Sequence, residues 1–204
     1  MKSKKNTLYT GKGDQGTTTL FDCKQGRISK SAILIEALGS VDELNAYLGI
    51  IKVYSDIDKI VLTINNFTSK AGNSRKICYS KILEEIQQNL FIIQAELGGS
   101  DIFVNRKELI KIEKIIKQIA KVLPPITSFT ISGGSVISSS LDFARTLARK
   151  SERRIISVSE EGSRIINPNT ISYMNRLSSI LFAMSRYANH IFSIKEEHPK
   201  YNKK

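Results

Sequence analysis

The stretch NRKELIKIEKIIKQIAKVLPP, residues 105–125, decides the fold class of this chain. Its apolar residues recur every three or four positions and share one helical face: Leu109, Ile112, Ile116, Ile119 and Leu123. Asn105 and Glu108 precede this run as a helix cap pair. Pro124-Pro125 ends the helix, because proline has no backbone N–H to continue the hydrogen-bond ladder. The stretch therefore predicts one long amphipathic helix.

The same periodicity predicts four further helices, at roughly residues 31–53, 82–97, 137–162 and 168–191. Gly98-Gly99 supplies a stop for the second of the five, and Asn167-Pro168 an N-cap and first turn for the last. Five long helices with mostly short connections predict an all-α protein, an up-and-down five-helix bundle. Residues 1–204 are expected to form a single domain.

Two segments fall outside this pattern. Residues 55–76 contain a β-prone patch and then a polar run rich in Gly, Asn and Ser, which we interpret as a loop or insertion. Residues 196–204 are strongly polar, and we expect a frayed tail there.

Composition excludes several kinds of chemistry. Cys23 and Cys78 are the only cysteines, and His190 and His198 the only histidines. A Cys/His zinc site and a Ser-His or Cys-His catalytic unit both lack sufficient parts. No apolar run approaches a membrane span, so we expect a cytoplasmic protein with no membrane partner.

The charge balance points to an anionic partner. Lysine and arginine number 31 against 19 acidic residues, a formal charge of +12. Nucleic acid and a polyphosphate ligand would both suit this excess, as would a solvated basic surface.

Residues 10–19, TGKGDQGTTT, combine three glycines with four threonines. Bare backbone amides and hydroxyls offer hydrogen bonds to anionic oxygens, so the stretch is typical of a phosphate cradle. It is not a Walker A loop, because Lys12 comes early and Asp14 stands in the middle. An ordinary surface turn is the alternative.

Polar residues flank the apolar stripes of three predicted helices. Arg145, Arg149 and Glu152 share one face of the fourth helix, because they are spaced four and three positions apart. Asp42 on the first helix has a similar position, as do four residues of the fifth: Asn175, Ser178, Ser179 and Phe182. Such flanks form a solvated edge, a binding site or a subunit interface.

Six blocks of this sequence together resemble the PduO-type ATP:cob(I)alamin adenosyltransferases. They are TGKGDQGTTT (10–19), RISK (27–30), ALGSVDELNAYLG (37–49), FTISGG (129–134), ARTLARKSERR (144–154) and MNRLSSILF (174–182). The resemblance implies a five-helix bundle, ferritin-like in general shape, that assembles as a homotrimer. It also implies active sites at subunit interfaces, where ATP and Mg²⁺ adenosylate reduced cobalamin and triphosphate is released.

The resemblance assigns roles to individual residues. The phosphates of ATP would be wrapped by residues 1–30, through Thr10, Gly11, Lys12, Gly13, Asp14, Gly16, Thr17, Thr18 and Lys30. Arg149 and Glu152 resemble the ATP-contacting pair, and Asn175 the polar group near nucleotide and metal. Asp42 and Arg145 resemble a cross-subunit ion pair, and Phe129 the aromatic residue beneath the corrin. Partners would be a cobalamin reductase and an adenosylcobalamin-dependent enzyme, with no nucleic acid.

Two departures from the family pattern, two alternative roles for single residues and two alternative functions qualify these assignments. The family usually has a second arginine where this chain has Lys150 and an aspartate where it has Ser179, so affinity or metal use is expected to differ. Lys30 could be a solvated lysine, and Phe129 a core aromatic. A nucleic-acid-binding bundle would explain the charge, although no stacking surface is evident. A helical protein that kept the fold without activity is another alternative to the enzyme.

Overall fold

The computed structural model describes residues 8–22, 26–65 and 74–201. The described residues form five helices and two short antiparallel hairpins. In chain order the elements are β1 (Thr17–Thr19), β2 (Arg27–Ser29), α1 (Ile33–Ile57), β3 (Val61–Asn65), β4 (Ser74–Cys78), α2 (Tyr79–Leu97), α3 (Arg106–Val122), α4 (Val136–Glu160) and α5 (Pro168–Ile191). The expected five-helix bundle is confirmed.

The helix ends follow the capping residues that the sequence predicts. The Asn105 side chain accepts a hydrogen bond from the Lys107 amide, and the Asn167 side chain accepts one from Asn169, both at 2.9 Å. Pro168 opens α5, and Gly98 follows the last residue of α2. These residues satisfy backbone groups that the first and last turns leave without intrahelical partners.

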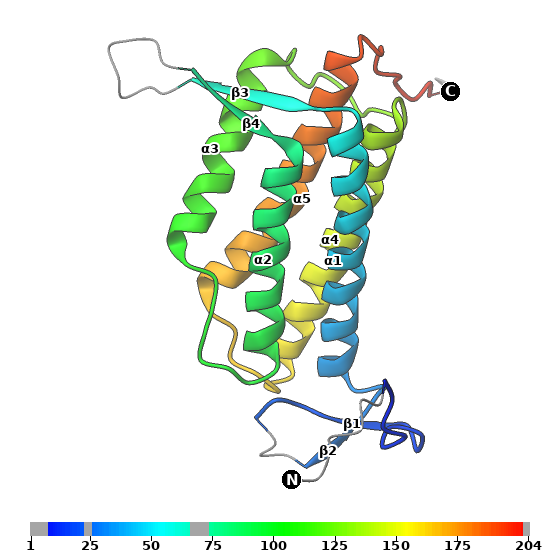
Figure 1. Cartoon of the computed structure of the whole chain (residues 1–204), viewed down its shortest axis with the longest axis vertical. Coiled ribbons are helices and arrows are strands. Elements are labelled where there is room, and N and C mark those ends of the chain that lie inside the picture. The colour runs from blue at the N-terminus through cyan, green and yellow to red at the C-terminus, as the bar shows by residue number, and fades with distance from the viewer. Residues whose placement is uncertain (1–7, 23–25, 66–73, 202–204) are drawn as a thin grey trace.

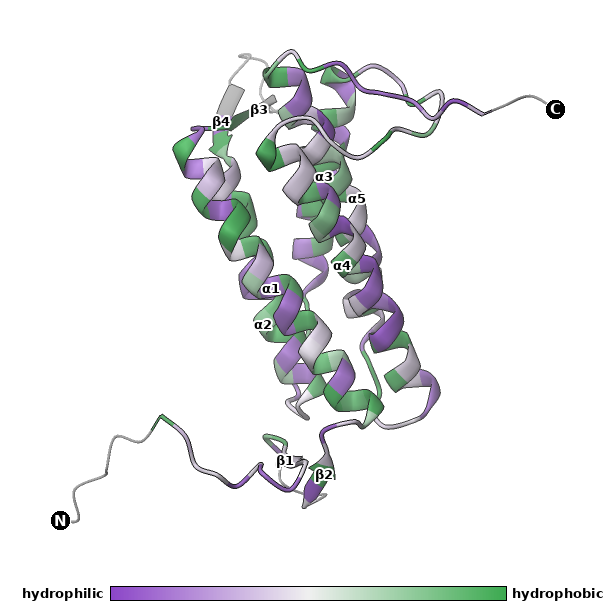
Figure 2. Cartoon of the chain, turned by 90° about the vertical axis from the view of Figure 1, so that its right-hand side faces the viewer, coloured by the Kyte–Doolittle hydropathy of each residue, from purple (hydrophilic) through white to green (hydrophobic). Residues whose placement is uncertain are grey.

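The helices run up and down in alternation along the chain (Figure 1). In space α1 packs against α2 and α4, while α5 packs against α4 and α3. Hydrophobic and hydrophilic residues alternate along each helix, as expected for helices that face both core and solvent (Figure 2). No described helix is long and apolar enough to cross a membrane.

The first helix ends about one turn later than predicted. It continues to Ile57, because Ser55 is buried and its hydroxyl bonds to the Lys52 carbonyl at 2.8 Å. Lys59, with a φ of 50°, then turns the chain away from the helix.

The described part of residues 55–76 contains regular structure where the sequence suggests a loop or insertion with a β-prone patch. The chain forms a β3–β4 hairpin, with Val61 opposite Cys78. Leu62 is buried in the core and the Tyr187 hydroxyl donates to the Val61 carbonyl at 3.4 Å, so tertiary contacts hold the hairpin. Residues 66–73 lie outside the described residues.

The expectation of a frayed tail from residue 196 is also wrong for its first part. Glu196 forms an ion pair with Arg186, the Glu197 carbonyl accepts a backbone hydrogen bond, and His198 contacts the loop that joins α3 to α4. These contacts join residues far apart in sequence, which a local polarity pattern cannot reveal.

The N-terminal hairpin β1–β2 and the α3–α4 loop lie at opposite ends of the bundle (Figure 1). The 25-residue α4 begins beside the α3–α4 loop and runs toward the β1–β2 hairpin. We call the end of the bundle that carries β1 and β2 the hairpin end. At 1.5 Å per residue this helix is about 37 Å long. The two ends of the molecule therefore present two separate surfaces.

Candidate active site

A cavity of about 370 Å³ opens between the α3–α4 loop, α4 and α5. Its lining residues are Ile126, Ser128, Phe129, Thr130, Arg145, Arg149, Ser178, Ser179 and Phe182. The structure thus brings together the polar flanks that the sequence places on α4 and α5. We refer to this space as the Phe129 cavity.

A second hollow, of about 440 Å³, continues along the same two helices. It is lined by Arg149, Glu152, Arg153, Ile156, Ser157, Glu160 and Asn175, and we refer to it as the Asn175 hollow. Arg149 lines both spaces, so the two spaces adjoin at this residue. The arrangement places one permanent cation between an aromatic-lined cavity and a polar hollow.

Phe129 is a surface residue, with 79% of it exposed. The interpretation of Phe129 as a core aromatic is therefore excluded. A large apolar ring held in solvent offers a flat face to a ligand.

Asn175 is held in a network of hydrogen bonds at the floor of its hollow. Its amide nitrogen donates to Glu152 Oε1 at 2.9 Å, and its amide oxygen accepts from Arg176 at 2.7 Å. Arg176 in turn bonds to Glu113 of α3 at 3.1 Å. Arg176 and Glu113 orient Asn175 toward Glu152, a role that the sequence analysis did not assign.

Within one chain Arg145 lies close to Asp142, not to Asp42, its expected partner across subunits. Its Nε lies 3.5 Å from Asp142 Oδ1, one turn earlier on α4, but this buried Nε makes no hydrogen bond within the described residues. Burial raises the pKa of Asp142 above its usual value, and the Arg145 guanidinium opposes that shift. Arg145 therefore retains an unused donor beside the Phe129 cavity.

Asp42 is occupied by a neighbour on α2. The Gln94 amide donates to Asp42 Oδ1 at 3.3 Å. Among the described ion pairs of this single chain, Asp42 does not meet Arg145. Their predicted contact across subunits stays a prediction.

The N-terminal loop is shaped by glycine. Gly11 and Gly16 have φ values of +67° and +73°, which side-chain-bearing residues rarely adopt. Turns close through backbone hydrogen bonds from Asp14 to Gly11 and from Gly16 to Gly13, at 3.2 and 3.1 Å. Such turns leave the remaining amides of the loop available to a ligand.

Lys30 lies against this loop. A Cβ added at Gly13 would come within 3.0 Å of Lys30 Nζ, so the glycine lets the ammonium group approach the backbone. The Lys30 amide also donates to the Gly16 carbonyl at 2.9 Å. The structure thus places Lys30 with the loop residues that the resemblance groups with it.

Arg27 is the residue of this loop that sequence reasoning missed. Its guanidinium donates to the Thr17 hydroxyl and carbonyl, both at 2.8 Å, and also to the Lys12 carbonyl. The side chain crosslinks β1, β2 and the turn before them. Arg27 belongs to the quoted RISK block, but nothing in the sequence indicates which carbonyls it contacts.

The loop and the two α4–α5 spaces are not joined within one chain. Among the described residues, no hydrogen bond or ion pair joins residues 10–18 to a residue that lines either space. The loop lies at the β1–β2 end of the bundle, whereas the segment that joins α3 to α4 lies at the other end (Figure 1).

The two departures from the family pattern have different surroundings. Lys150 forms an ion pair with Glu43 of α1 at 2.6 Å and lines neither space. Ser179 lines the Phe129 cavity. A changed affinity is therefore expected from Ser179 more than from Lys150.

Comparison with known proteins identifies relatives over nearly the whole chain. A family model described as cobalamin adenosyltransferase matches residues 8–188. The corrinoid adenosyltransferase PduO of Citrobacter freundii is 34% identical over 90% of this chain and 50% of its own length. The PduO of Salmonella typhimurium is 33% identical over 88% of this chain and 48% of its own. The chain thus spans about half the length of these curated relatives.

Solved structures agree with this match. A variant of the PduO-type ATP:corrinoid adenosyltransferase from Lactobacillus reuteri, complexed with cobalamin and ATP, superposes with a TM-score of 0.78. It is 29% identical, and the match covers 96% of this chain and 100% of that one. This chain belongs to the cobalamin adenosyltransferase family.

Proposed function

We propose that this protein transfers the 5′-deoxyadenosyl group of ATP to the cobalt of cob(I)alamin. The observation that carries the proposal is the pair of adjoining spaces that share Arg149. The Phe129 cavity suits the face of a corrin, and the Asn175 hollow suits a nucleotide. Arg149 would then stand beside the atoms that react.

The reaction needs no protein base. The cobalt(I) centre supplies an electron pair to C5′ of the ribose, the cobalt–carbon bond forms, and the bond from C5′ to the triphosphate oxygen breaks. No proton is transferred in this step, which suits a chain with only two histidines. The protein contributes orientation and stabilisation of charge on the leaving triphosphate.

Cationic groups and amides would stabilise that charge. Arg149 offers two or more donors to a phosphate oxygen, and Lys30 offers a compact charge next to the backbone amides of the Gly13 turn. Arg27 would act by holding the turn in shape.

The residues of the Asn175 hollow fit Mg²⁺. This ion prefers oxygen ligands and commonly binds one or two carboxylates together with substrate phosphates. The Glu152 carboxylate and the Asn175 amide oxygen supply such atoms. When bound with ATP, Mg²⁺ would neutralise negative charge on the phosphates.

A complete site would require a neighbouring subunit. Within one chain no described hydrogen bond or ion pair joins the phosphate loop to the Asn175 hollow, although this hollow extends along α4 to Glu160, the last residue of the helix. We infer that the loop of one chain serves the α4–α5 spaces of another, in a homotrimer.

Exposed apolar residues on α1 and α4 support this assembly. Ile50, Val53 and Ile57 follow one face of α1, and Val136 and Phe143 are exposed on the adjacent α4. An apolar surface shared by two packed helices favours contact with another chain. The Arg145 guanidinium, which lines the Phe129 cavity, and the exposed Asp42 would then pair between subunits.

An assay of adenosylation tests the proposal directly. The protein is incubated anaerobically with ATP, Mg²⁺ and chemically reduced cobalamin, and the visible spectrum is followed. We expect the spectrum of adenosylcobalamin and release of triphosphate. Absence of product with folded, ATP-binding protein would contradict the proposal and favour a family member that kept the fold without activity.

A further inference from the structure

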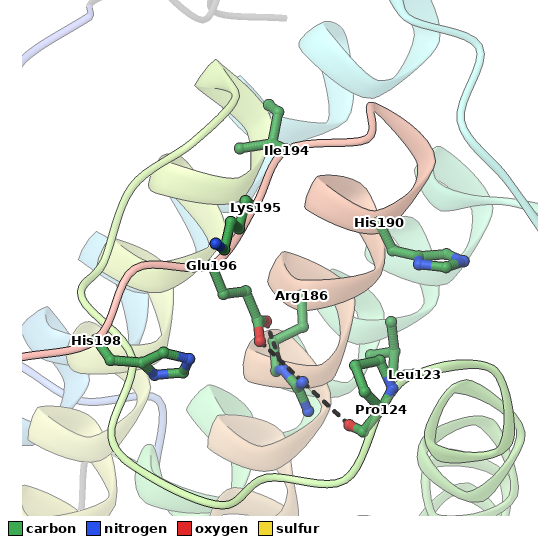
Figure 3. Close-up of a pocket in the computed structure, with 8 residues that line it drawn as sticks. All are labelled: Leu123, Pro124, Arg186, His190, Ile194, Lys195, Glu196 and His198. Carbon is green, nitrogen blue, oxygen red and sulfur yellow. Dashed lines mark hydrogen bonds and ion pairs between the residues drawn. The ribbon is translucent and has the colours of Figure 1, made fainter.

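The chain after α5 turns back along the loop that carries Phe129. Ser193, with a φ of 55°, makes the turn, and the Ile194 amide bonds to the Asn189 carbonyl at 2.9 Å. The following residues border a cavity of about 300 Å³ between α5 and the α3–α4 loop (Figure 3). We call residues 194–198 the strap.

An ion pair anchors the strap to α5. Arg186 Nε and Nη2 donate to the two carboxylate oxygens of Glu196 at 2.6 and 2.9 Å, and only 8% of Arg186 is exposed. The same Nη2 also donates to the Pro124 carbonyl at 3.1 Å (Figure 3). This bidentate pair therefore ties the strap to the beginning of the α3–α4 loop.

Two further contacts hold the middle of the loop. The Ile131 amide donates to the Glu197 carbonyl at 2.8 Å. His198 Nδ1 lies 2.9 Å from both the Phe129 carbonyl and the Ser128 hydroxyl. Because a carbonyl oxygen only accepts, the tautomer with a hydrogen on Nδ1 donates to Phe129, whereas the other tautomer accepts from the Ser128 hydroxyl.

The end of the loop is fixed by α5 itself. The Asn189 amide donates to the Gly133 carbonyl at 3.0 Å and accepts from the Ser135 amide at 3.3 Å. A Cβ at Gly134 would collide with Asn189 Oδ1, so the backbone passes against this side chain. The loop is thus held at its start, middle and end by α5 and the strap.

These contacts bear on Phe129 because its ring has little support of its own. With 79% of the residue exposed, packing cannot set the position of the ring. The backbone at Phe129 must set it, and the strap bonds directly to that backbone.

We propose that the strap positions the Phe129 ring in its cavity, with His198 as the positioning residue and the Arg186–Glu196 pair as its anchor. The inference rests on the proposed function for its catalytic consequence. The structural part of the inference is that His198 orders the Phe129 loop, and this part does not depend on any reaction.

The first test uses hydrogen–deuterium exchange of peptides that cover residues 126–135 in the ligand-free protein. His198→Ala should speed exchange about fivefold, the factor expected for one lost hydrogen bond. His198→Asn, which can place an amide N–H near the position of Nδ1, should restore slow exchange. Lys195→Ala is the control, because Lys195 borders the same cavity and its side chain forms no hydrogen bond or ion pair with the described residues. Equal exchange in His198→Ala and the parent would overturn the inference.

The second test measures turnover of cob(II)alamin with a reductant, divided by turnover of pre-reduced cob(I)alamin. This ratio should fall several-fold in His198→Ala, recover in His198→Asn and stay unchanged in Lys195→Ala. Phe129→Ala is the reference. If Phe129→Ala lowers the ratio and His198→Ala does not, the strap inference is overturned. If Phe129→Ala leaves the ratio unchanged, the role of Phe129 in the proposed function has failed, and the exchange result alone decides the strap.

Discussion

The two ends of this bundle hold their loops in different ways. At the hairpin end, the Gly/Thr loop is shaped by its own backbone turns and by one side chain, Arg27. At the other end, the Phe129 loop has no described secondary structure and is held by α5 and the strap. A glycine loop of this kind suits a flexible chain of phosphates, whereas a single ring beneath a rigid corrin requires fixed placement.

Between these ends stands Arg149, which belongs to both spaces. Changes at either end should therefore affect one substrate, and a change at Arg149 should affect both. The following predictions test that division.

Arg149→Ala should have the largest effect. Loss of a cation that stabilises the leaving triphosphate is expected to lower kcat/KM by about 10²- to 10³-fold for both substrates. Lys150→Ala is the matched control, because its neighbouring cation pairs with Glu43 and lines neither space. Steady-state kinetics measures kcat/KM of both variants. An equal decrease in the two would mean that Arg149 is not part of the active site.

Lys30→Ala should change the kinetics with respect to ATP alone. A lost phosphate contact is expected to raise KM for ATP and lower turnover, about 2 kcal/mol in transition-state stabilisation. The KM for cob(I)alamin should stay at the parent value. Unchanged ATP kinetics would mean that Lys30 is a solvated surface residue that does not contact ATP.

Phe129→Ala should change the use of cobalamin alone. The ring is mostly exposed, so the variant should melt within a few degrees of the parent and bind ATP normally. Turnover of cob(II)alamin with a reductant should fall about tenfold relative to turnover of cob(I)alamin, because a bulky apolar ring excludes the lower axial ligand. An equal decrease with both substrates would contradict this role.

Charge reversal at Asp42 and Arg145 should give the smallest effect. Asp42→Arg and Arg145→Asp should each weaken assembly or cobalamin use, and the double variant should recover about 1–2 kcal/mol. Sedimentation and cobalamin titration measure the two effects. Strict additivity would mean that the residues never meet.

The sequence predicted most of the helical framework. The caps at Asn105 and Asn167 are local, because each side chain bonds two residues away, and local patterns reveal local bonds. The apolar stripes likewise placed the polar flanks of α4 and α5 on one cavity.

Contacts between distant residues could not be predicted in this way. The strands β1 and β2 have three residues each, too few for a periodic pattern, and depend on the Arg27 crosslink. The His198–Phe129 contact joins residues 69 positions apart. A polar segment such as 196–204 resembles a frayed tail until its partners are known.

The central claim is that each site combines the phosphate loop of one chain with the α4–α5 spaces of another. It can be tested by co-expressing Lys30→Ala and Arg149→Ala chains under two affinity tags and purifying mixed oligomers. Each variant alone should be nearly inactive. A mixed trimer contains the two variants in a 2:1 or 1:2 ratio, so about one third of its sites should combine an intact loop with an intact Arg149, and substantial adenosylation should return. Activity no greater than that of the separate variants would contradict a site shared between chains.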